Sequence, residues 1–242
     1  MAEKVKPYKD SELGKKEQVK QMFDAISEDY DGLNRVISFG LDLIWRKRVV
    51  RAVLNKRATK VLDIATGTGD LAIQMAGKGI PQVTGLDISP GMLEVGREKI
   101  HRKGLDHKVE MIVGDSENLP FEDEVFDAVT VAFGVRNFEH LEKGLSEIYR
   151  ILKKEGVLVV LETSVPTKFP FKQGYKVYTK YILPLIGKLF SKDKSAYAYL
   201  SESAAAFPYG EEFNNILGKI GFIAMENRPQ TFGVATIYTA IK

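Results

Sequence analysis

The chain has 242 residues, a formal net charge of +3 and no cysteine. This length suits one large domain and is sufficient to bury a full hydrophobic core. The small net charge gives no indication of nucleic-acid binding, and the lack of cysteine excludes disulfides and thiolate chemistry. No apolar run approaches the roughly 18 residues that span a bilayer, and residues 1–17 lack the apolar core of a secretory signal. We therefore expect a cytoplasmic location, with any membrane contact restricted to the bilayer surface.

The N-terminal region begins with a polar, lysine-rich stretch, residues 1–13, for which we expect a loosely attached tail. A first amphipathic helix follows, because apolar residues recur at the i, i+3, i+4, i+7 spacing of one helix face. These apolar residues are Val19, Met22, Phe23 and Ile26. Residues 30–32, Tyr-Asp-Gly, are typical of a turn.

A second amphipathic helix is predicted over about residues 41–53. Its apolar face includes Trp45, for which packing in the core or in a lid is the expected role. Four basic side chains are expected on the outer side of this helix: Arg46, Lys47, Arg48 and Arg51. Residues 1–57 are thus interpreted as a tail and lid helices that precede the main domain, residues 58–242.

From residue 58 onward, short apolar stretches alternate with helical patterns, which predicts parallel βαβ units and an α/β fold. Residues 163–209 are rich in aromatics and lysine, and are interpreted as a helical insertion. The last two predicted strands would form an antiparallel hairpin. Strands are predicted at residues 60–64, 81–87, 109–113, 126–133, 156–162, 222–228 and 232–241, and helices at 70–77, 91–103, 140–152 and 211–220.

The most informative stretch is the turn after the first predicted strand. Gly67 and Gly69 let a ligand approach the main chain and make positive φ accessible, and the following helix presents its N-terminus. Asp63 lies where the strand ends, at the edge where open α/β sheets bind ligands. The turn fits the G-x-G-x-x-G/A dinucleotide fingerprint. It also fits the acidic-x-G-x-G-x-G turn of enzymes that use S-adenosylmethionine (SAM), with Ala65 replacing the first glycine. The third interpretation is a strand-to-helix turn that binds no ligand.

Two further carboxylates follow the next two strands. Asp87 lies 20 residues after Gly67, where a carboxylate can accept hydrogen bonds from two ribose hydroxyls. Alternatively, residues 87–90, Asp-Ile-Ser-Pro, are the start of a helix. Asp115 and Ser116 end the third strand, where a carboxylate could hold the exocyclic amine of an adenine; ordinary loop solvation is the alternative. The position of Asp63 ahead of the glycines, together with the antiparallel closing strand, favours SAM over a nicotinamide cofactor.

Several segments together resemble the UbiE/MenG family of SAM-dependent C-methyltransferases of menaquinone and ubiquinone biosynthesis. SAM motifs shared by many methyltransferases lie in residues 62–71, 85–92 and 119–126. The segments Phe-Gly-Val-Arg-Asn (133–137) and Leu-Glu-Thr-Ser-Val-Pro (161–166) are more specific to the family, and the resemblance runs from about residue 16 to the end. It implies a Rossmann-like class I methyltransferase fold: a mostly parallel seven-stranded sheet with an antiparallel last strand, N-terminal helices and an insertion after strand five.

By motif, the resemblance places the family's SAM contacts on four residues: Thr68, Asp87, Asp115 and Ser116. Asp63 and Gly67 complete the candidate cofactor site. Ala65 departs from a common glycine, which is tolerable if its φ is negative. Ala132 stands where some members have a serine that contacts the cofactor, so a hydroxyl contact is absent at this position.

Methylation of a ring carbon requires an electron-rich quinol ring and a ring carbon in line with the donated methyl at about 3–3.5 Å; no metal is required. Arg136 and Asn137, after strand four, are the candidate catalytic pair. Arg136 lies in an apolar segment where it needs a partner or an oxyanion, and its guanidinium could stabilise a phenolate. Its pKa, above about 12, makes it a poor base. Glu162 is either an alternative base or the partner of Arg136 in a structural ion pair, and His140 is expected to start a helix.

Residues 168–194 combine apolar residues at helical spacing with seven lysines and a single acid, Asp193. Such a segment fits the surface of an anionic membrane, where a prenylated substrate resides; a helix packed on the sheet edge is the alternative. The apolar positions are Phe171, Tyr175, Tyr178, Ile182, Leu185 and Leu189, with a kink expected at Pro184. The lysines are Lys168, Lys172, Lys176, Lys180, Lys188, Lys192 and Lys194.

The resemblance therefore implies methyl transfer from SAM to a polyprenylated quinol, converting demethylmenaquinol to menaquinol. The alternative substrate is the benzoquinol precursor of ubiquinone. A non-catalytic subunit that binds SAM or a quinone is an alternative of another class. The sequence fixes neither the prenyl chain length nor the oligomeric state, and a homodimer is compatible with it.

Overall fold

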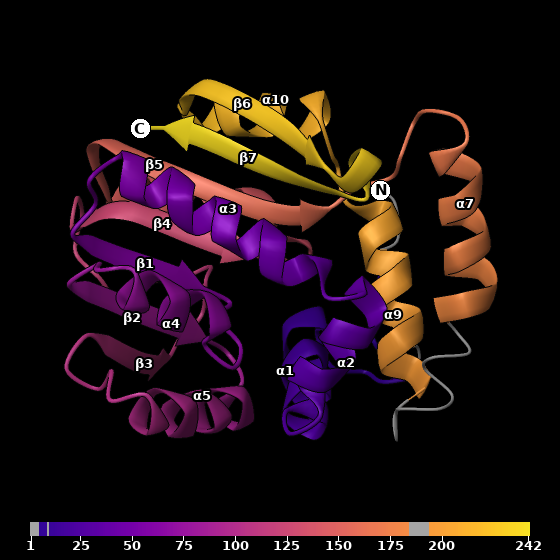
Figure 1. Cartoon of the computed structure of the whole chain (residues 1–242), viewed down its shortest axis with the longest axis horizontal. Helices are drawn as coiled ribbons and strands as arrows, with labels where there is room; N and C mark the ends of the chain where they lie inside the picture. Colours follow the sequence, from indigo (N-terminus) through magenta and orange to yellow (C-terminus); the bar gives the residue numbers. More distant parts are fainter. Residues whose placement is uncertain (1–4, 9, 184–193) are drawn as a thin grey trace.

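A computed structural model describes residues 5–8, 10–183 and 194–242 of the chain. Its centre is a seven-stranded sheet in the order β3-β2-β1-β4-β5-β7-β6 (Figure 1). The first five strands are parallel, and β7 is antiparallel to both β5 and β6. The expected fold, mostly parallel with an antiparallel closing strand, is confirmed. The strands are β1 (Lys60–Ile64), β2 (Gln82–Asp87), β3 (Val109–Val113), β4 (Phe126–Ala132), β5 (Leu152–Thr163), β6 (Ile223–Gln230) and β7 (Ala235–Ile241).

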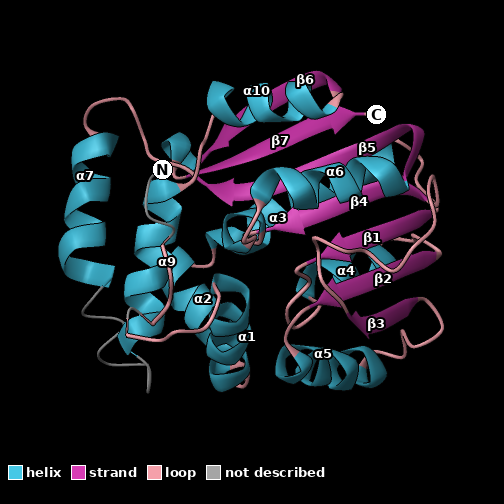
Figure 2. Cartoon of the chain, turned by 180° about the vertical axis from the view of Figure 1, so that it is seen from behind, coloured by secondary structure: helices cyan, strands magenta, loops and turns pink. Residues whose placement is uncertain are grey.

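Helices cover both faces of this sheet, because successive residues of each strand point to opposite sides. Val61 of β1 is buried against one helical layer, and the next residue, Leu62, against the other (Figures 1 and 2). Apolar burial on both faces explains the nearly continuous apolar strands in the sequence. The first layer contains α3 (Leu41–Asn55), α4 (Asp70–Gly77) and α5 (Pro90–Arg102), and the second contains α6 (Leu141–Ile151) and α10 (Glu211–Ile220).

The remaining helices gather at the carboxyl ends of the parallel strands (Figure 1). α1 and α9, far apart in sequence, pack together through Val19, Met22, Ala196 and Tyr199. The helix start that was the alternative interpretation of residues 87–90 is present, because the Ser89 hydroxyl accepts a hydrogen bond from the backbone N–H of Met92 at 3.1 Å. These helices at the strand ends are α1 (Lys15–Ile26), α2 (Tyr30–Ser38), α7 (Phe171–Val177), a π-helical turn η2 (Tyr178–Ile182) and α9 (Lys194–Ala206).

Two expectations for the N-terminal region are wrong. Residues 30–32 begin helix α2 instead of forming a turn. In the expected tail, Val5 and Tyr8 pack against the cluster between α1 and α9, and the backbone N–H of Tyr8 donates to Gln18 Oε1 at 2.9 Å. The fully buried Gln18 amide draws this segment onto α1, because a buried polar group needs hydrogen-bond partners.

Helix α3 forms as predicted, but Arg46 does not lie on its outer side. The Arg46 side chain is only 8% exposed, whereas the other three basic residues of the predicted set face solvent. Asp42, one turn earlier, is buried beside Arg46, with 3.6 Å between Asp42 Oδ2 and Arg46 Nε. Trp45 is buried as expected, and its indole N–H donates to Thr231 Oγ1 at 2.9 Å.

The predicted insertion is helical where the structure describes it, as α7, η2 and α9. Phe171 and Ile182 are exposed, while Tyr175 and Tyr178 are partly buried. Several expectations fall outside the described residues: the kink at Pro184, the apolar positions Leu185 and Leu189, and the charges of Lys188, Lys192 and Asp193.

Candidate active site

The turn after β1 is organised by a buried carboxylate. Asp63 is 1% exposed and accepts hydrogen bonds from the hydroxyls of Thr66 and Thr130, both at 2.6 Å. Burial raises the pKa of Asp63 to about 6, against the lowering effect of the two hydroxyls. Asp63 lines neither of the two cavities described below, so its position fits a role in holding the turn between β1 and β4.

Asp63→Asn is expected to change how stability depends on pH between about pH 4 and 6. The folded pKa, about 6, exceeds the reference value of 3.8, so in this window the folded protein binds more protons and loses stability as the pH rises. The free energy of unfolding in urea, wild type minus variant, should decrease from pH 4 to pH 6 and stay constant above. A difference that is the same at every pH would contradict the raised pKa.

The same turn requires left-handed backbone at Ala65, Gly67 and Gly69, whose φ angles are +51°, +57° and +76°. The condition under which alanine would be tolerated without strain at position 65, a negative φ, is therefore not met, and Ala65 adopts a conformation that costs an L-residue about 1–2 kcal/mol. The turn directs the backbone N–H of Gly67 to Asp87 Oδ2 at 2.8 Å. A Cβ at Gly134 would come within 2.5 Å of the Ala65 Cβ, so the glycine allows the segment after β4 to lie against the turn.

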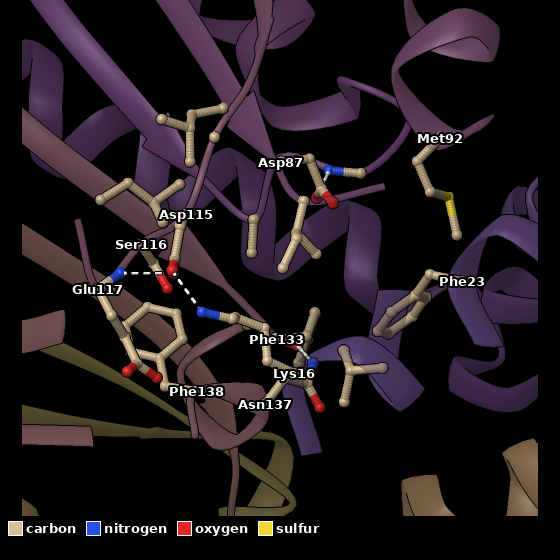
Figure 3. A pocket seen from close by; sticks show the side chains of 18 of the residues that line it. Lys16, Phe23, Asp87, Met92, Asp115, Ser116, Glu117, Phe133, Asn137 and Phe138 are labelled. Carbon is tan, nitrogen blue, oxygen red and sulfur yellow. Dashed lines mark hydrogen bonds and ion pairs between the residues drawn. The ribbon is translucent and has the colours of Figure 1, made fainter. Parts of the chain in front are cut away.

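A first cavity, with a volume of about 70 Å³, lies beside this turn and is lined on one side by residues of α1 (Figure 3). Four of the six predicted cofactor residues line it: Gly67, Asp87, Asp115 and Ser116. Asp87 Oδ1 accepts the backbone N–H of Ser89 at 2.9 Å. Since each Asp87 oxygen accepts one backbone N–H, each keeps a further lone pair for a ligand.

Lys16 of α1 reaches across the first cavity to Asp115. Its ammonium donates to Asp115 Oδ2 at 2.8 Å, while Oδ1 accepts the backbone N–H of Glu117 at 2.9 Å (Figure 3). Burial alone would raise the pKa of Asp115, but these hydrogen bonds hold it below its ordinary value. Asp115 is therefore an anion at neutral pH, and α1 is fastened over it by an ion pair.

Thr68 is not on the wall of either cavity. Its hydroxyl donates to Asp31 Oδ1 at 2.6 Å and accepts from Lys99 Nζ at 3.1 Å. Lys99 also pairs with Asp31 at 2.6 Å and with Asp70, and Arg35 pairs with Asp70 at 2.5 Å. These ion pairs connect α2 and α5 to the start of α4. The structure thus places Thr68 where it can hold α2 beside the turn.

A second cavity, of about 610 Å³, is bounded by α2, α3, α7, α9 and the 3₁₀ turn η3 (Thr231–Gly233). Tyr30 and Phe133 line both cavities and form the wall between them. Most of the lining is apolar or aromatic, and includes Ile37, Phe39, Trp45, Phe171, Tyr175, Tyr178, Leu183, Leu200 and Phe232. Its charged lining residues are Asp42, Arg46 and Arg136.

The 3₁₀ turn η1 (Val135–Asn137) divides the predicted catalytic pair between the cavities. Arg136 lines the second cavity, and its Nη1 donates to Glu162 Oε1 at 2.6 Å and to the Phe133 carbonyl at 2.8 Å. Burial would lower the pKa of Arg136, but the Glu162 charge raises it above its ordinary value. Glu162 is fully buried and lines neither cavity, so its geometry is that of a partner to Arg136 instead of a base.

Asn137 lines the first cavity, and its Oδ1 accepts the Tyr199 hydroxyl of α9 at 3.0 Å. His140 lies outside both cavities, and its Nδ1 is 2.9 Å from Glu117 Oε2. It directly precedes α6, as its expected role at a helix start implies.

Three residues of this arrangement were not selected from the sequence: Lys16, Tyr30 and Arg46. Each comes from the helices before β1, and reaches the site only because those helices fold over the strand ends. The only sequence signal for Arg46 is its i, i+4 spacing from Asp42, which places the two side chains on one helix face. Burial raises the pKa of Tyr30, so its hydroxyl stays protonated at the wall between the cavities.

The sheet order, the glycine turn and the carboxylates after β2 and β3 define a class I SAM-dependent methyltransferase. A model of the ubiE/COQ5 methyltransferase family matches residues 11–242, and the chain belongs to this family. S-adenosylmethionine is its expected cofactor.

The chain is similar to several proteins over nearly its whole length. It is 49% identical to a demethylmenaquinone methyltransferase of Bacteroides fragilis, over 99% of this chain and 98% of that protein. It is 42% identical to the ubiquinone/menaquinone biosynthesis C-methyltransferase UbiE of Geobacter sulfurreducens, over 99% and 93%. A solved SAM-dependent methyltransferase from Thermotoga maritima, 20% identical, covers 92% of this chain and 99% of its own with a TM-score of 0.66, which supports the fold.

Proposed function

We propose that the protein methylates a ring carbon of a polyprenylated naphthohydroquinone, converting demethylmenaquinol to menaquinol. The observation that carries this proposal is the second cavity. It is large and mostly apolar, as a prenylated ring requires, and it meets the first cavity at Tyr30 and Phe133. The name of the Bacteroides fragilis relative supports this substrate. The name of the Geobacter sulfurreducens relative supports the benzoquinol of ubiquinone biosynthesis as the second candidate.

The residues of the first cavity fit S-adenosylmethionine. Asp87 offers two carboxylate oxygens to the ribose hydroxyls, and Gly67, without a side chain, lets the ligand approach the backbone. Asp115 and Ser116 offer acceptors to the adenine amine, and Asn137 lies toward the wall shared with the second cavity. The bound cofactor supplies an electrophilic methyl group.

Asp87→Ala should weaken SAM binding by about 1–3 kcal/mol, the cost of losing a buried hydrogen-bond acceptor. Isothermal titration calorimetry measures this directly. Asp106→Ala removes an exposed aspartate of a surface loop and serves as the control that should leave affinity unchanged. Wild-type affinity in Asp87→Ala would remove Asp87 from the cofactor site.

The proposed acceptor ring lies in the second cavity against the aromatic wall. The Phe133 and Trp45 rings lie 6.2 Å apart, centroid to centroid, and both line this cavity. Arg136 holds the Phe133 backbone and presents a permanent positive charge at the same place. A guanidinium beside a quinol hydroxyl favours the phenolate, which makes the neighbouring ring carbon more nucleophilic.

A direct assay tests the function. Purified protein is incubated with methyl-labelled SAM and short-chain demethylmenaquinol, or with the matching benzoquinol, under reducing conditions. We expect label on the naphthohydroquinone ring, and preferential transfer to the benzoquinol would favour the second candidate. No transfer to either ring would refute the enzyme proposal and leave a binding subunit.

We also propose that α7 docks the protein on the inner face of the membrane, where the substrate resides. Phe39, Phe171 and Phe232 are exposed and also line the second cavity, so they mark its opening. Exposed lysines flank them on and before α7 and η2: Lys168, Lys172, Lys176 and Lys180. Such a basic and aromatic surface suits anionic headgroups. In the part of the chain that the structure describes, no helix has the length and hydropathy to cross a bilayer.

Replacing these four lysines by glutamine should markedly reduce binding to phosphatidylglycerol vesicles, because each lysine near an anionic surface contributes about 1 kcal/mol. Wild-type binding in a sedimentation assay should also fall as salt rises. The matched control replaces four exposed lysines elsewhere, Lys56, Lys78, Lys103 and Lys219. Equal binding by both quadruple variants would show that α7 is not the docking surface.

A further inference from the structure

The charged side chain of Arg46 is buried beside the second cavity. Its side chain is 8% exposed, and its Nε is a buried nitrogen with no hydrogen-bond partner among the described residues. Its only ion-pair contact among these residues is Asp42 Oδ2, at 3.6 Å from Nε, which is too long for a hydrogen bond. A buried charge in this state is costly, so the site lacks an acceptor.

Asp42 does not supply that acceptor in this structure, because its Oδ2 lies 3.6 Å from Arg46 Nε and its carboxylate is held by other donors. Its Oδ1 accepts the Ser38 hydroxyl at 2.7 Å, and its Oδ2 accepts the guanidinium of Arg35. Arg35 in turn connects Asp42 to Asp70 at the start of α4. The Asp42 carboxylate therefore balances the charge of Arg46 without accepting a hydrogen bond from its Nε, which leaves that donor for a ligand.

Arg46 lies where an aromatic acceptor ring would be held. It lines the second cavity, and its Cζ is 5.8 Å from the centroid of the Phe133 ring. Arg136 contacts the backbone carbonyl of the same Phe133. Two guanidinium groups thus flank the residue that separates the cavities, one beside its ring and one at its main chain.

From this arrangement we propose that Arg46 binds the second oxygen of the quinol, the one remote from the ring carbon that is methylated. This inference rests on the proposed function and assigns a second contact to the same substrate. A para-quinol carries two oxygens on opposite sides of its ring, and two separate cations match them. Arg136 stabilises the oxygen next to the reacting carbon, and Arg46 fixes the orientation of the ring by hydrogen-bonding the other.

The test compares two acceptors in two proteins. One acceptor is a short-chain 2-prenyl-1,4-naphthohydroquinone, and the other is the corresponding 3-prenyl-1-naphthol, which keeps the hydroxyl next to the methylated carbon and lacks the remote one. For the quinol, Arg46→Gln should lower kcat/KM by about tenfold to a hundredfold, the range for a hydrogen bond to a charged group, mainly by raising KM. For the naphthol, wild type and variant should agree within threefold. An equal loss on both acceptors would overturn the proposal and leave Arg46 a purely structural residue.

Two further variants secure the result. Arg51→Gln makes the same change on the exposed side of α3 and should behave as wild type with both acceptors. Arg46→Lys keeps a cation beside Asp42 and should retain part of the quinol activity that Arg46→Gln loses. If Arg46→Gln does not fold, the same two-acceptor comparison is made with Arg46→Lys. Failure of wild type to methylate the quinol would instead refute the proposed function.

Discussion

Arg136→Gln is expected to lower kcat by about 10²–10³-fold, the usual effect of removing one donor to a developing oxyanion. The affinity for SAM should stay within twofold of wild type, because Arg136 lines the second cavity and not the first. Glu162 keeps the guanidinium charged and fixed by a 2.6 Å hydrogen bond. Steady-state kinetics with demethylmenaquinol, together with calorimetry for SAM, separate the two effects.

Two controls accompany this experiment. Arg228→Gln removes an exposed arginine whose ion pair with Glu226 lies on β6, and should retain full activity. The double variant Arg136→Gln/Glu162→Gln removes both members of the buried pair, so its low activity cannot come from an unpaired Glu162 carboxylate. A wild-type kcat in Arg136→Gln would exclude Arg136 from the chemistry.

Glu162→Ala should have the largest effect on stability, a loss of about 3–5 kcal/mol in the free energy of unfolding. Glu162 is fully buried at the end of β5, and its partner Arg136 has a side chain that is 8% exposed. Removing the carboxylate leaves a cation in the protein interior without compensation. Urea denaturation measures the loss, and binding of substrate should partly restore it because only the folded protein binds.

The matched control is Glu226→Ala, which breaks the pair with Arg228 at the protein surface. Surface pairs of this kind contribute about 0–1 kcal/mol, so the two variants should differ by several kcal/mol. Similar unfolding free energies for the two variants would show that Glu162 and Arg136 are not a stabilising pair.

The fold could be predicted because each strand and helix after residue 58 carries its own local pattern. Asp87 and Asp115 were found for a related reason: the carboxyl ends of parallel strands meet at one sheet edge, so a polar residue that ends a strand is already placed. Both line the first cavity. The partner of Arg136 could also be named, since Glu162 ends the neighbouring strand β5.

Residues on the N-terminal helices could not be placed in this way. Whether Arg46 faces solvent or a cavity depends on α2, α7 and α9, which bound the second cavity together with α3, and the pattern of α3 alone does not contain that information. Thr68 is the opposite case: the sequence selected it, but it lines neither cavity. Its motif position suggests a cofactor contact, but the charges of Asp31 and Lys99, contributed by two other helices, engage its hydroxyl.

Ala65 shows that the backbone conformation of the turn could not be predicted from the sequence either. An alanine in place of the glycine is unstrained only at negative φ, but the backbone of the turn, with φ of +51° at Ala65, is held by the sheet and by the Gly67–Asp87 hydrogen bond. Local preference is worth only about 1–2 kcal/mol at such a residue, which tertiary contacts can exceed.

Among the described residues, only Tyr30 and Phe133 line both cavities. In the proposed function, the polar donor and the lipid acceptor therefore occupy separate spaces, and the acceptor can be exchanged without displacing the donor. In the proposed membrane-docked state, spent donor would be replaced from the aqueous side while the second cavity stays open to the lipid. One docked molecule could then modify many quinols in succession, searching for them in two dimensions without repeated binding to the bilayer.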